Sequence, residues 1–216
     1  MKILILTAME KERQMFLSME NNKYWKEHTV IVRECGIGKV NAAMNTTKEI
    51  LSSLPDIVIS SGVAGGCGEN IDILDTIVGE KVSYHDVWCG RPNVFGQIQG
   101  MPSEFVAPSE ILDKIKGLKI EKIKFGKIVS GDWFVDTKDK MQEIQQKFPD
   151  ASAVDMESSA IAQVCHAFNV PFLSIRVISD LPLKENNTKQ YKNFWENVSK
   201  TSFDAVLKVI ECIKNV

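Results

Sequence analysis

The sequence lacks an apolar run that approaches the roughly 18 residues needed to cross a membrane. Its start is apolar only over residues 3–6, and the charged stretch Glu10–Arg13 follows soon after. An apolar run of this length is too short for the apolar region of a signal peptide. An excess of one charge is also missing, because 26 Lys and Arg face 28 Asp and Glu. Nucleic acids and anionic membranes are held by a large positive excess. We therefore expect a cytoplasmic protein with neither nucleic acid nor membrane as a partner.

Metal-binding and nucleotide-binding patterns are missing as well. The five cysteines are widely spaced and form no Cys-x-x-Cys pair, so we expect reduced thiols. His85 and His166 have no partner at metal-ligand spacing. The glycine-rich stretch 62–68 has neither the Lys-Ser/Thr ending of a phosphate-binding loop nor the Gly-x-Gly-x-x-Gly spacing of a dinucleotide fold. The sequence thus predicts no metal and no cofactor.

What is present is an alternation of strand and helix patterns. Such an order predicts an α/β sheet covered by helices on both faces. Without a linker-like stretch or an internal repeat, the 216 residues are expected to form a single domain, 1–216. We expect strands at 2–7, 29–34, 56–61, 75–83, 124–130 and 171–179, helices at 10–19, 39–54, 109–116, 137–148, 155–168 and 199–214, and an irregular polar loop between 179 and 199.

Charged residues follow several of these strands, where open α/β sheets place their ligand sites. Glu10 begins a helix, and the helix dipole alone explains an acid there. Asp180 ends a strongly apolar strand, where it either caps the next turn or performs chemistry. Arg176 lies within that strand and needs an anion or several acceptors, because a guanidinium among aliphatic side chains is costly.

Glu157 is placed by helical spacing on the apolar face of the helix expected at 155–168. It lies four and seven residues before Ile161 and Val164. An acid on a buried face is costly unless it is paired or hydrogen-bonded. Two explanations are equally consistent with this position: backbone amides at the start of the helix bind the carboxylate of Glu157, or the carboxylate has a functional role.

Taken in order, these junctions resemble one family, the 5′-methylthioadenosine/S-adenosylhomocysteine nucleosidases of the nucleoside phosphorylase superfamily. The resemblance runs from residue 1 to roughly 205. It implies a three-layer α/β/α sandwich around a mixed, partly barrel-like central sheet, and a homodimer. The matching segments are Ala8–Glu10, Gly36–Val40, Gly62–Gly66, Tyr84–Asp86, Ser130–Phe134, Val154–Glu157, His166–Phe172 and Arg176–Leu181.

The resemblance implies hydrolysis of the N-glycosidic bond of methylthioadenosine or S-adenosylhomocysteine, which releases adenine and a thioribose. Positive charge then builds up on the sugar, as in glycosidases. Asp180, with Ser179 beside it, matches the acid that protonates the purine N7, so we predict that desolvation raises its pKa. Glu10, aided by Arg176, matches the group that activates water. Glu157 matches the acid that holds the ribose hydroxyls.

The resemblance also implies the walls of the substrate pocket. Phe134 would stack on adenine while the backbone of Val135 reads the base edge. Soft apolar side chains would surround the sugar and the alkylthio tail, with one wall supplied by the partner subunit near 95–102. The residues implied around the sugar and tail are Met9, Ile37, Phe95, Met156 and Phe194.

Two departures from the family pattern concern the sugar end of the pocket. Val63 stands where the family commonly has a Ser or Thr that helps to hold the water. Asp155 stands where Glu is frequent, and this change is able to move a ribose contact. The segment 183–192 matches poorly.

Three other functions remain open at the level of sequence. They are a phosphate-dependent purine nucleoside phosphorylase, a nucleosidase for another purine nucleoside, and a non-catalytic nucleoside-binding relative of the fold. A carboxylate at position 10 and the run Ile59–Ser61, where phosphorylases use arginines, favour water over phosphate. The retention of Glu10, Glu157 and Asp180 favours an enzyme over a storage protein.

Overall fold

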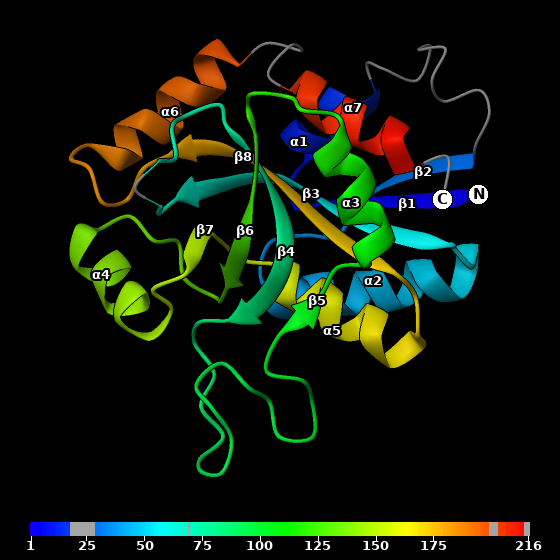
Figure 1. Cartoon of the computed structure of the whole chain (residues 1–216), viewed down its shortest axis with the longest axis horizontal. Helices are drawn as coiled ribbons and strands as arrows, with labels where there is room; N and C mark the ends of the chain where they lie inside the picture. Colours follow the sequence, from blue (N-terminus) through cyan, green and yellow to red (C-terminus); the bar gives the residue numbers. More distant parts are fainter. Residues whose placement is uncertain (18–28, 69, 199–202, 214–216) are drawn as a thin grey trace.

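A computed structural model describes residues 1–17, 29–68, 70–198 and 203–213 of the chain (Figure 1). In this part of the chain the strands are β1 (Lys2–Thr7), β2 (Thr29–Glu34), β3 (Ile57–Gly66), β4 (Thr76–Tyr84), β5 (Phe105–Val106), β6 (Ile123–Ser130), β7 (Ala151–Asp155) and β8 (Phe172–Asp180). The helices are α1 (Glu10–Leu17), α2 (Lys39–Ser53), α3 (Ser109–Gly117), α4 (Lys138–Lys147), α5 (Ser158–Phe168), α6 (Asn187–Asn197) and α7 (Asp204–Ile213).

The sheet is mixed and closes on itself. β3 pairs with both β7 and β8, β8 pairs with β4, β4 with β6, and β6 with β7, so these strands form a ring. β1 and β2 extend the sheet outward from β3 in parallel, and β5 pairs with the outer side of β4. The predicted fold class, with its partly barrel-like sheet, is confirmed.

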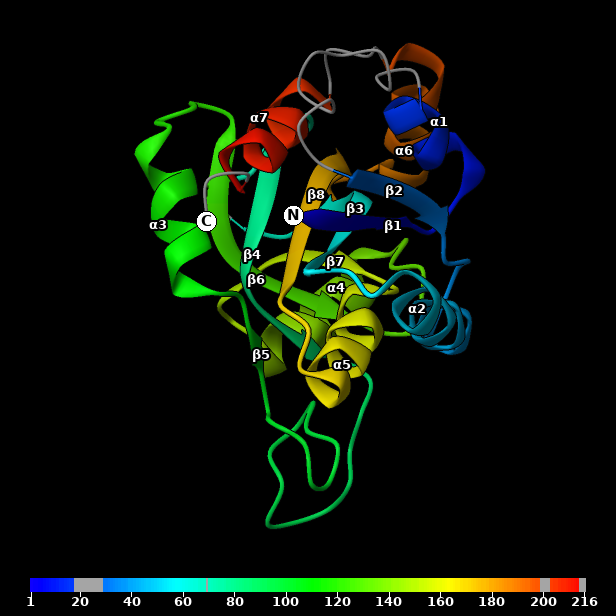
Figure 2. The same cartoon turned by 90° about the vertical axis from the view of Figure 1, so that its right-hand side faces the viewer.

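Helices cover the sheet from opposite sides. α2 and α5 pack together on one side, whereas α1, α6 and α7 lie on the other (Figures 1 and 2). Each side has its own apolar core, the first including residues of α2 and α5 and the second residues of α3 and α7. All nine residues of β8 are buried between these cores, as expected for a strand with apolar side chains on both faces.

Several elements differ from the sequence-based expectation, among them the short strands β5 and β7, which were not expected. The helix expected at 155–168 begins only at Ser158, because residues 151–155 form β7, a short strand that pairs with β3 and β6. The irregular loop expected between 179 and 199 contains α6, which a largely polar composition concealed. The expected ends of the helices at 10–19 and 199–214 include positions outside the described residues.

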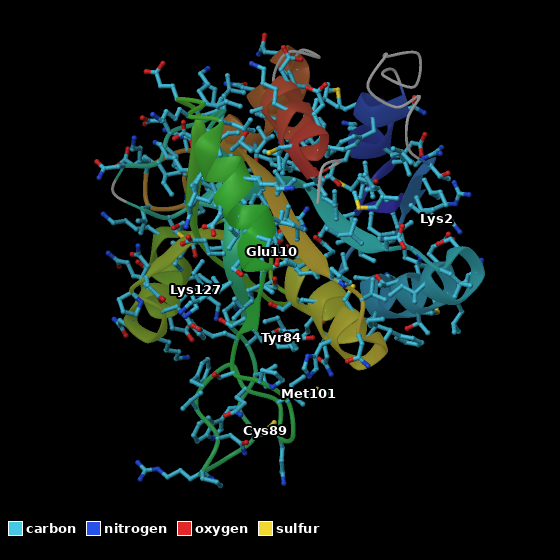
Figure 3. The ribbon with its side chains drawn as sticks, turned by 45° about the vertical axis from the view of Figure 1, so that its right-hand side comes forward. Lys2, Tyr84, Cys89, Met101, Glu110 and Lys127 are labelled. Carbon is cyan, nitrogen blue, oxygen red and sulfur yellow. The ribbon has the colours of Figure 1, made fainter. Side chains whose placement is uncertain are left out.

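The topology brings several strand ends to one edge of the sheet. β1, β3 and β8 run parallel, so their carboxyl ends, and the residues that follow them, lie together. The segment 85–104 leaves β4 and extends away from the body of the molecule (Figures 1 and 3). Among the described residues, no helix combines the length and apolar character that crossing a bilayer requires.

Candidate active site

A cavity of about 310 Å³ opens at the carboxyl edge of β1, β3 and β8. It receives side chains from segments spread over most of the chain, and four of the lining residues are acids. The residues that line it are Ala8, Met9, Glu12, Ile37, Val63, Ala64, Gly65, Trp133, Phe134, Val135, Val154, Asp155, Met156, Glu157, Ser179, Asp180 and Tyr191.

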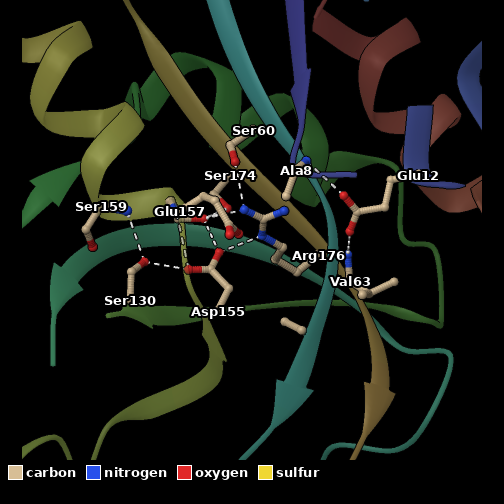
Figure 4. A network of polar contacts seen from close by, with 12 residues as sticks. Ala8, Glu12, Ser60, Val63, Ser130, Asp155, Glu157, Ser159, Ser174 and Arg176 are labelled. Atoms are coloured by element: carbon tan, nitrogen blue, oxygen red, sulfur yellow. Dashed lines mark hydrogen bonds and ion pairs between the residues drawn. The ribbon is translucent and has the colours of Figure 1, made fainter. Parts of the chain in front are cut away.

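Glu12 supplies the acid at the α1 end of this cavity (Figure 4). One carboxylate oxygen, Oε2, accepts hydrogen bonds from the amides of Ala8 (2.9 Å) and Met9 (3.1 Å). The other, Oε1, accepts from the amide of Val63 at 2.8 Å. Glu12 therefore binds the amides that precede its own helix and joins that helix to β3.

The structure corrects the role expected for Glu10. Its side chain is 51% exposed, pairs with Arg13 at 2.8 Å and accepts a hydrogen bond from Gln14, and it does not line the cavity. The helical period explains the difference. Glu12 lies four residues before the buried Phe16 and shares its face of α1, whereas Glu10 does not. That spacing to Phe16 was the available sequence signal for Glu12.

Glu157 faces the cavity from the position immediately before α5. Its Oε1 accepts a hydrogen bond from the amide of Gly38 at 3.0 Å, at the start of α2. It makes no side-chain cap bond to its own helix. The predicted position on an apolar helix face was wrong, because the helix begins one residue later, at Ser158. The buried acid is instead satisfied by an amide 119 residues away in the chain.

Asp180 ends β8 on the same cavity, with Ser179 beside it as expected. The Ser179 hydroxyl donates to Asp180 Oδ1 at 2.6 Å. Burial raises the pKa of Asp180 to about 6, although hydrogen bonds from Ser179 and Asn187 oppose the shift. The predicted increase in the pKa of this carboxyl is thus present in the structure.

Arg176 is not a lining residue of the cavity, and Figure 4 shows its guanidinium beside Asp155. Its Nε donates to Asp155 Oδ2 at 2.6 Å, and both side chains are 1% exposed. Its Nη2 donates to the hydroxyls of Ser60 (2.8 Å) and Ser158 (3.0 Å). Asp155 also accepts from Ser130 at 2.5 Å and from Ser158. Arg176 therefore has the anion and the acceptors that its place within a strand demands.

Three buried carboxyls, those of Glu12, Asp155 and Glu157, interact electrostatically with the guanidinium of Arg176. Burial raises the pKa of Glu12, against the opposing charge of Arg176 and three amide hydrogen bonds. Burial, assisted by the negative charge of Asp155, raises the pKa of Glu157 to about 7. Because Asp155 holds the direct ion pair, Arg176 does not cancel the effect of burial on Glu12, and Glu157 is left as a group able to exchange a proton near neutral pH.

Gly62 allows this close arrangement. A Cβ at that position would overlap the Glu12 carboxylate and lie 2.7 Å from Arg176 Nη1. The carboxylate and the guanidinium therefore approach each other across the bare backbone of β3.

The remaining walls are apolar and aromatic. Met9, Ile37, Val63 and Met156 line the cavity as expected. Phe134 lines it as well and meets Tyr191 edge to face, with ring centroids 5.3 Å apart. Tyr191 comes from α6, which was not expected as a helix, so sequence analysis missed it. The Val135 backbone also lines the cavity, but its carbonyl accepts a hydrogen bond from Asn187 at 3.2 Å.

Two expected wall residues do not line this cavity within the single chain, although the wall near Phe95 was expected from the partner subunit and that expectation stays a prediction. Phe95, in the segment 85–104, stacks on Trp88 with centroids 6.1 Å apart and packs against Phe148. Phe194 is buried in the core beneath α6 and lines a different cavity, between α6 and α7. Residues 179–199 were expected to form a loop, so helical spacing could not be used to predict that Phe194 of α6 packs into the core.

The cavity, with four acids among apolar and aromatic walls, has the character of an enzyme site for a small organic ligand. The chain belongs to the phosphorylase superfamily, whose family model matches residues 2–211. A 5′-methylthioadenosine/S-adenosylhomocysteine nucleosidase of Staphylococcus aureus (strain bovine RF122 / ET3-1) is 37% identical over 185 residues, 84% of this chain and 81% of that protein.

Solved structures agree with this assignment. The nucleosidase of the same description from S. pneumoniae, with a transition-state inhibitor, has a TM-score of 0.89 at 28% identity and covers 99% of this chain and 100% of its own. A putative nucleosidase of the same kind from Borrelia burgdorferi, bound to adenine, has a TM-score of 0.87 at 34% identity with the same coverage. The resemblance drawn from the sequence is confirmed.

Proposed function

We propose that this protein hydrolyses the N-glycosidic bond of 5′-methylthioadenosine or S-adenosylhomocysteine and releases adenine. The observation that carries the proposal is the convergence of Glu12, Glu157 and Asp180 on one cavity. The activity named for the relatives supports it. Cleavage of this bond requires a proton for the base, an activated water and stabilisation of a cationic sugar, and three acids in distinct surroundings are suited to these tasks.

Asp180 is the proposed general acid. Adenine is a poor leaving group as an anion, so the purine N7 needs a proton as the bond breaks. A carboxyl with a pKa near 6 is protonated in a useful fraction of molecules, and enclosure by substrate raises that fraction further. Phe134 stands on the same cavity, where its ring is able to stack on the base.

Glu12 takes the role that the sequence analysis gave to Glu10. Its carboxylate is fixed by three backbone amides, so it is already oriented to accept a proton from water. Arg176 lies beneath it and favours the charged form of the carboxyl. Val63 contributes its amide to Glu12, and this backbone contact does not depend on the Ser or Thr hydroxyl common in the family.

Glu157 is the proposed ligand of the ribose hydroxyls. Its Oε1 accepts from Gly38, which holds the side chain toward the cavity beside Met156. Hydrogen bonds from sugar hydroxyls to a carboxylate strengthen as positive charge develops on the ring. Asp155 does not take part directly, because its oxygens are bound to Arg176 and two serines.

Water is favoured over phosphate as the attacking group. A phosphate ion in the cavity would meet three carboxyls, and the nearby Arg176 is already paired with Asp155. The direct test is incubation of purified protein with methylthioadenosine in phosphate-free buffer and quantification of adenine. Release without phosphate supports the proposal; release only after phosphate is added would identify a phosphorylase; and no release in either condition would exclude both enzymes for this substrate.

A second copy of the chain is the proposed partner. On α2, the apolar side chains of Val40, Met44 and Leu51 are 76%, 59% and 62% exposed. They adjoin an apolar hollow of about 520 Å³ between α2, α5 and the start of the segment 85–104. Exposed apolar surface of this kind marks an interaction site. Light scattering should give the mass of a dimer for the wild type and of a monomer for Val40→Glu.

A further inference from the structure

The N-terminus of α2 holds acids from two different loops. Two consecutive amides point to different carboxylates: Gly38 donates to Glu157 Oε1 at 3.0 Å, and Lys39 donates to Asp132 Oδ1 at 2.7 Å. Gly38 has φ +85°, and a Cβ there would lie 2.9 Å from Asp132 Oδ1. Both the backbone conformation and the close approach therefore require glycine at this position.

The side chain of Lys39 connects a third segment. Its Nζ lies 2.7 Å from Asp86 Oδ2 and 3.9 Å from Asp132 Oδ2. The amide of Asp132 also donates to Asp86 Oδ2, at 2.9 Å. One lysine thus joins the end of β4 to the loop after β6, and it neutralises part of the charge of two neighbouring aspartates.

Two of the connected segments lead directly to residues that line the cavity. Ile37 precedes Lys39 by two residues and lines one wall, while Phe134 and Val135 follow Asp132 and line another. The separation of these walls sets how closely a planar base and its sugar are held. The partners are 26%, 28% and 46% exposed for Lys39, Asp86 and Asp132, so the group contributes little to global stability.

We infer that Lys39 is a positioning residue for the nucleoside, because it draws the loop 131–135 toward the start of α2 through Asp86 and Asp132. The inference rests on the proposed function, since the ligand is taken to be an adenine nucleoside. Without the ammonium group, two aspartates that share it would face each other as like charges, and the loop carrying Phe134 would move away from Ile37. Ground-state binding of the base is then weakened more than the chemical step.

The variant Lys39→Met tests this because it keeps the length of the side chain and removes its charge. We expect KM for methylthioadenosine and Kd for adenine to rise about fivefold, the size of one partly exposed ion pair, while kcat changes less than twofold. Adding Asp86→Asn to Lys39→Met should recover much of the loss, because Asn keeps an acceptor for the Asp132 amide and removes the repulsion. A loss of folding would not be repaired by a second substitution.

Lys116→Met is the matched control, because Lys116 also makes a 2.7 Å ion pair, with Glu80, away from the cavity. It should leave KM and Kd unchanged. An unchanged adenine Kd in Lys39→Met, or a weakened one that Asp86→Asn does not restore, would overturn the inference. Adenine binding by calorimetry separates the two proposals: a wild type that binds adenine without turnover contradicts the nucleosidase, whereas the positioning role is judged by the variants alone.

Discussion

Arg176 Nε lies 2.6 Å from Asp155 Oδ2, and water is excluded from both side chains. Asp155 lines the cavity whereas Arg176 does not, and four serine hydroxyls from different elements complete the surroundings of the pair: Ser60, Ser130, Ser158 and, through Ser158, Ser174. The result is a fixed positive group beside Glu12 and Glu157. The guanidinium is held in place by its ion pair with Asp155, and this pair does not require contact with the substrate.

Asp155→Asn should destabilise the fold by about 3 kcal/mol, because it leaves a buried guanidinium without its direct counterion. Urea unfolding measures the change. Glu143→Gln, which removes an exposed acid paired with Lys140 and Lys147, is the control and should cost less than about 0.5 kcal/mol. Equal stability of Asp155→Asn and wild type would show that Glu12 and Glu157 replace Asp155 as the counterion.

Glu12→Gln and Glu10→Gln form a matched pair, since both remove one charge from the same helix. Glu12 lines the cavity, whereas Glu10 pairs with Arg13 at the surface. We expect Glu12→Gln to lower kcat by about 10²–10⁴, the contribution of a general base, and Glu10→Gln to stay within twofold of wild type. Adenine release under saturating methylthioadenosine decides between them. The opposite pattern would restore Glu10 as the base.

The contrast between these two acids shows how far the sequence leads. Alternating patterns and buried strands predicted the sheet and its site edge, and the positions of Asp180 and Ser179 at the end of β8 followed directly. The choice between Glu10 and Glu12 depended on which helix face meets β3, a tertiary relationship. Only the packing of α1 shows that Val63 and Glu12 are neighbours.

α6 and β7 illustrate a second limit. α6 is largely polar, and β7 has only five residues, so neither has a strong periodic pattern. The failure to predict α6 explains why Tyr191 was missed, whereas Phe194 had been placed in the pocket by the family resemblance. Glu157 was expected in the site from the family resemblance, and that expectation did not depend on where its helix begins.

The pH dependence of stability should reveal Asp180. Its pKa is about 6 in the folded protein, above the usual value of 3.8 for an aspartic acid, so the folded state binds the proton more tightly. This group therefore favours folding below pH 4, and that contribution is lost as pH rises through 6, by on the order of 2 kcal/mol. Asp180→Asn cannot titrate, and its free energy of unfolding should fall less between pH 4 and 7 than that of wild type. Identical slopes in urea titrations would contradict the raised pKa.

Activity should also require the proton on Asp180 and should therefore fall as pH rises. If Asp180 must be protonated to deliver its proton to N7, kcat/KM should decline as pH rises above about 6, because this constant reports the free enzyme. Asp180→Asn should lose about 10²-fold or more in kcat while Kd for adenine changes little. A variant with near-normal turnover would exclude Asp180 as the acid.

Phe134→Ala should weaken adenine binding by about 5- to 100-fold, because stacking on an aromatic ring contributes about 1–3 kcal/mol per base. The Phe134 ring meets the ring of Tyr191 edge to face, and this contact helps to fix its orientation at the cavity wall. Phe134→Tyr keeps the stacking face and should bind adenine as the wild type does. Calorimetric titration with adenine measures both variants. Equal affinity of Phe134→Ala and Phe134→Tyr would mean that the base lies against another wall, leaving Phe134 to order the loop that contains Asp132.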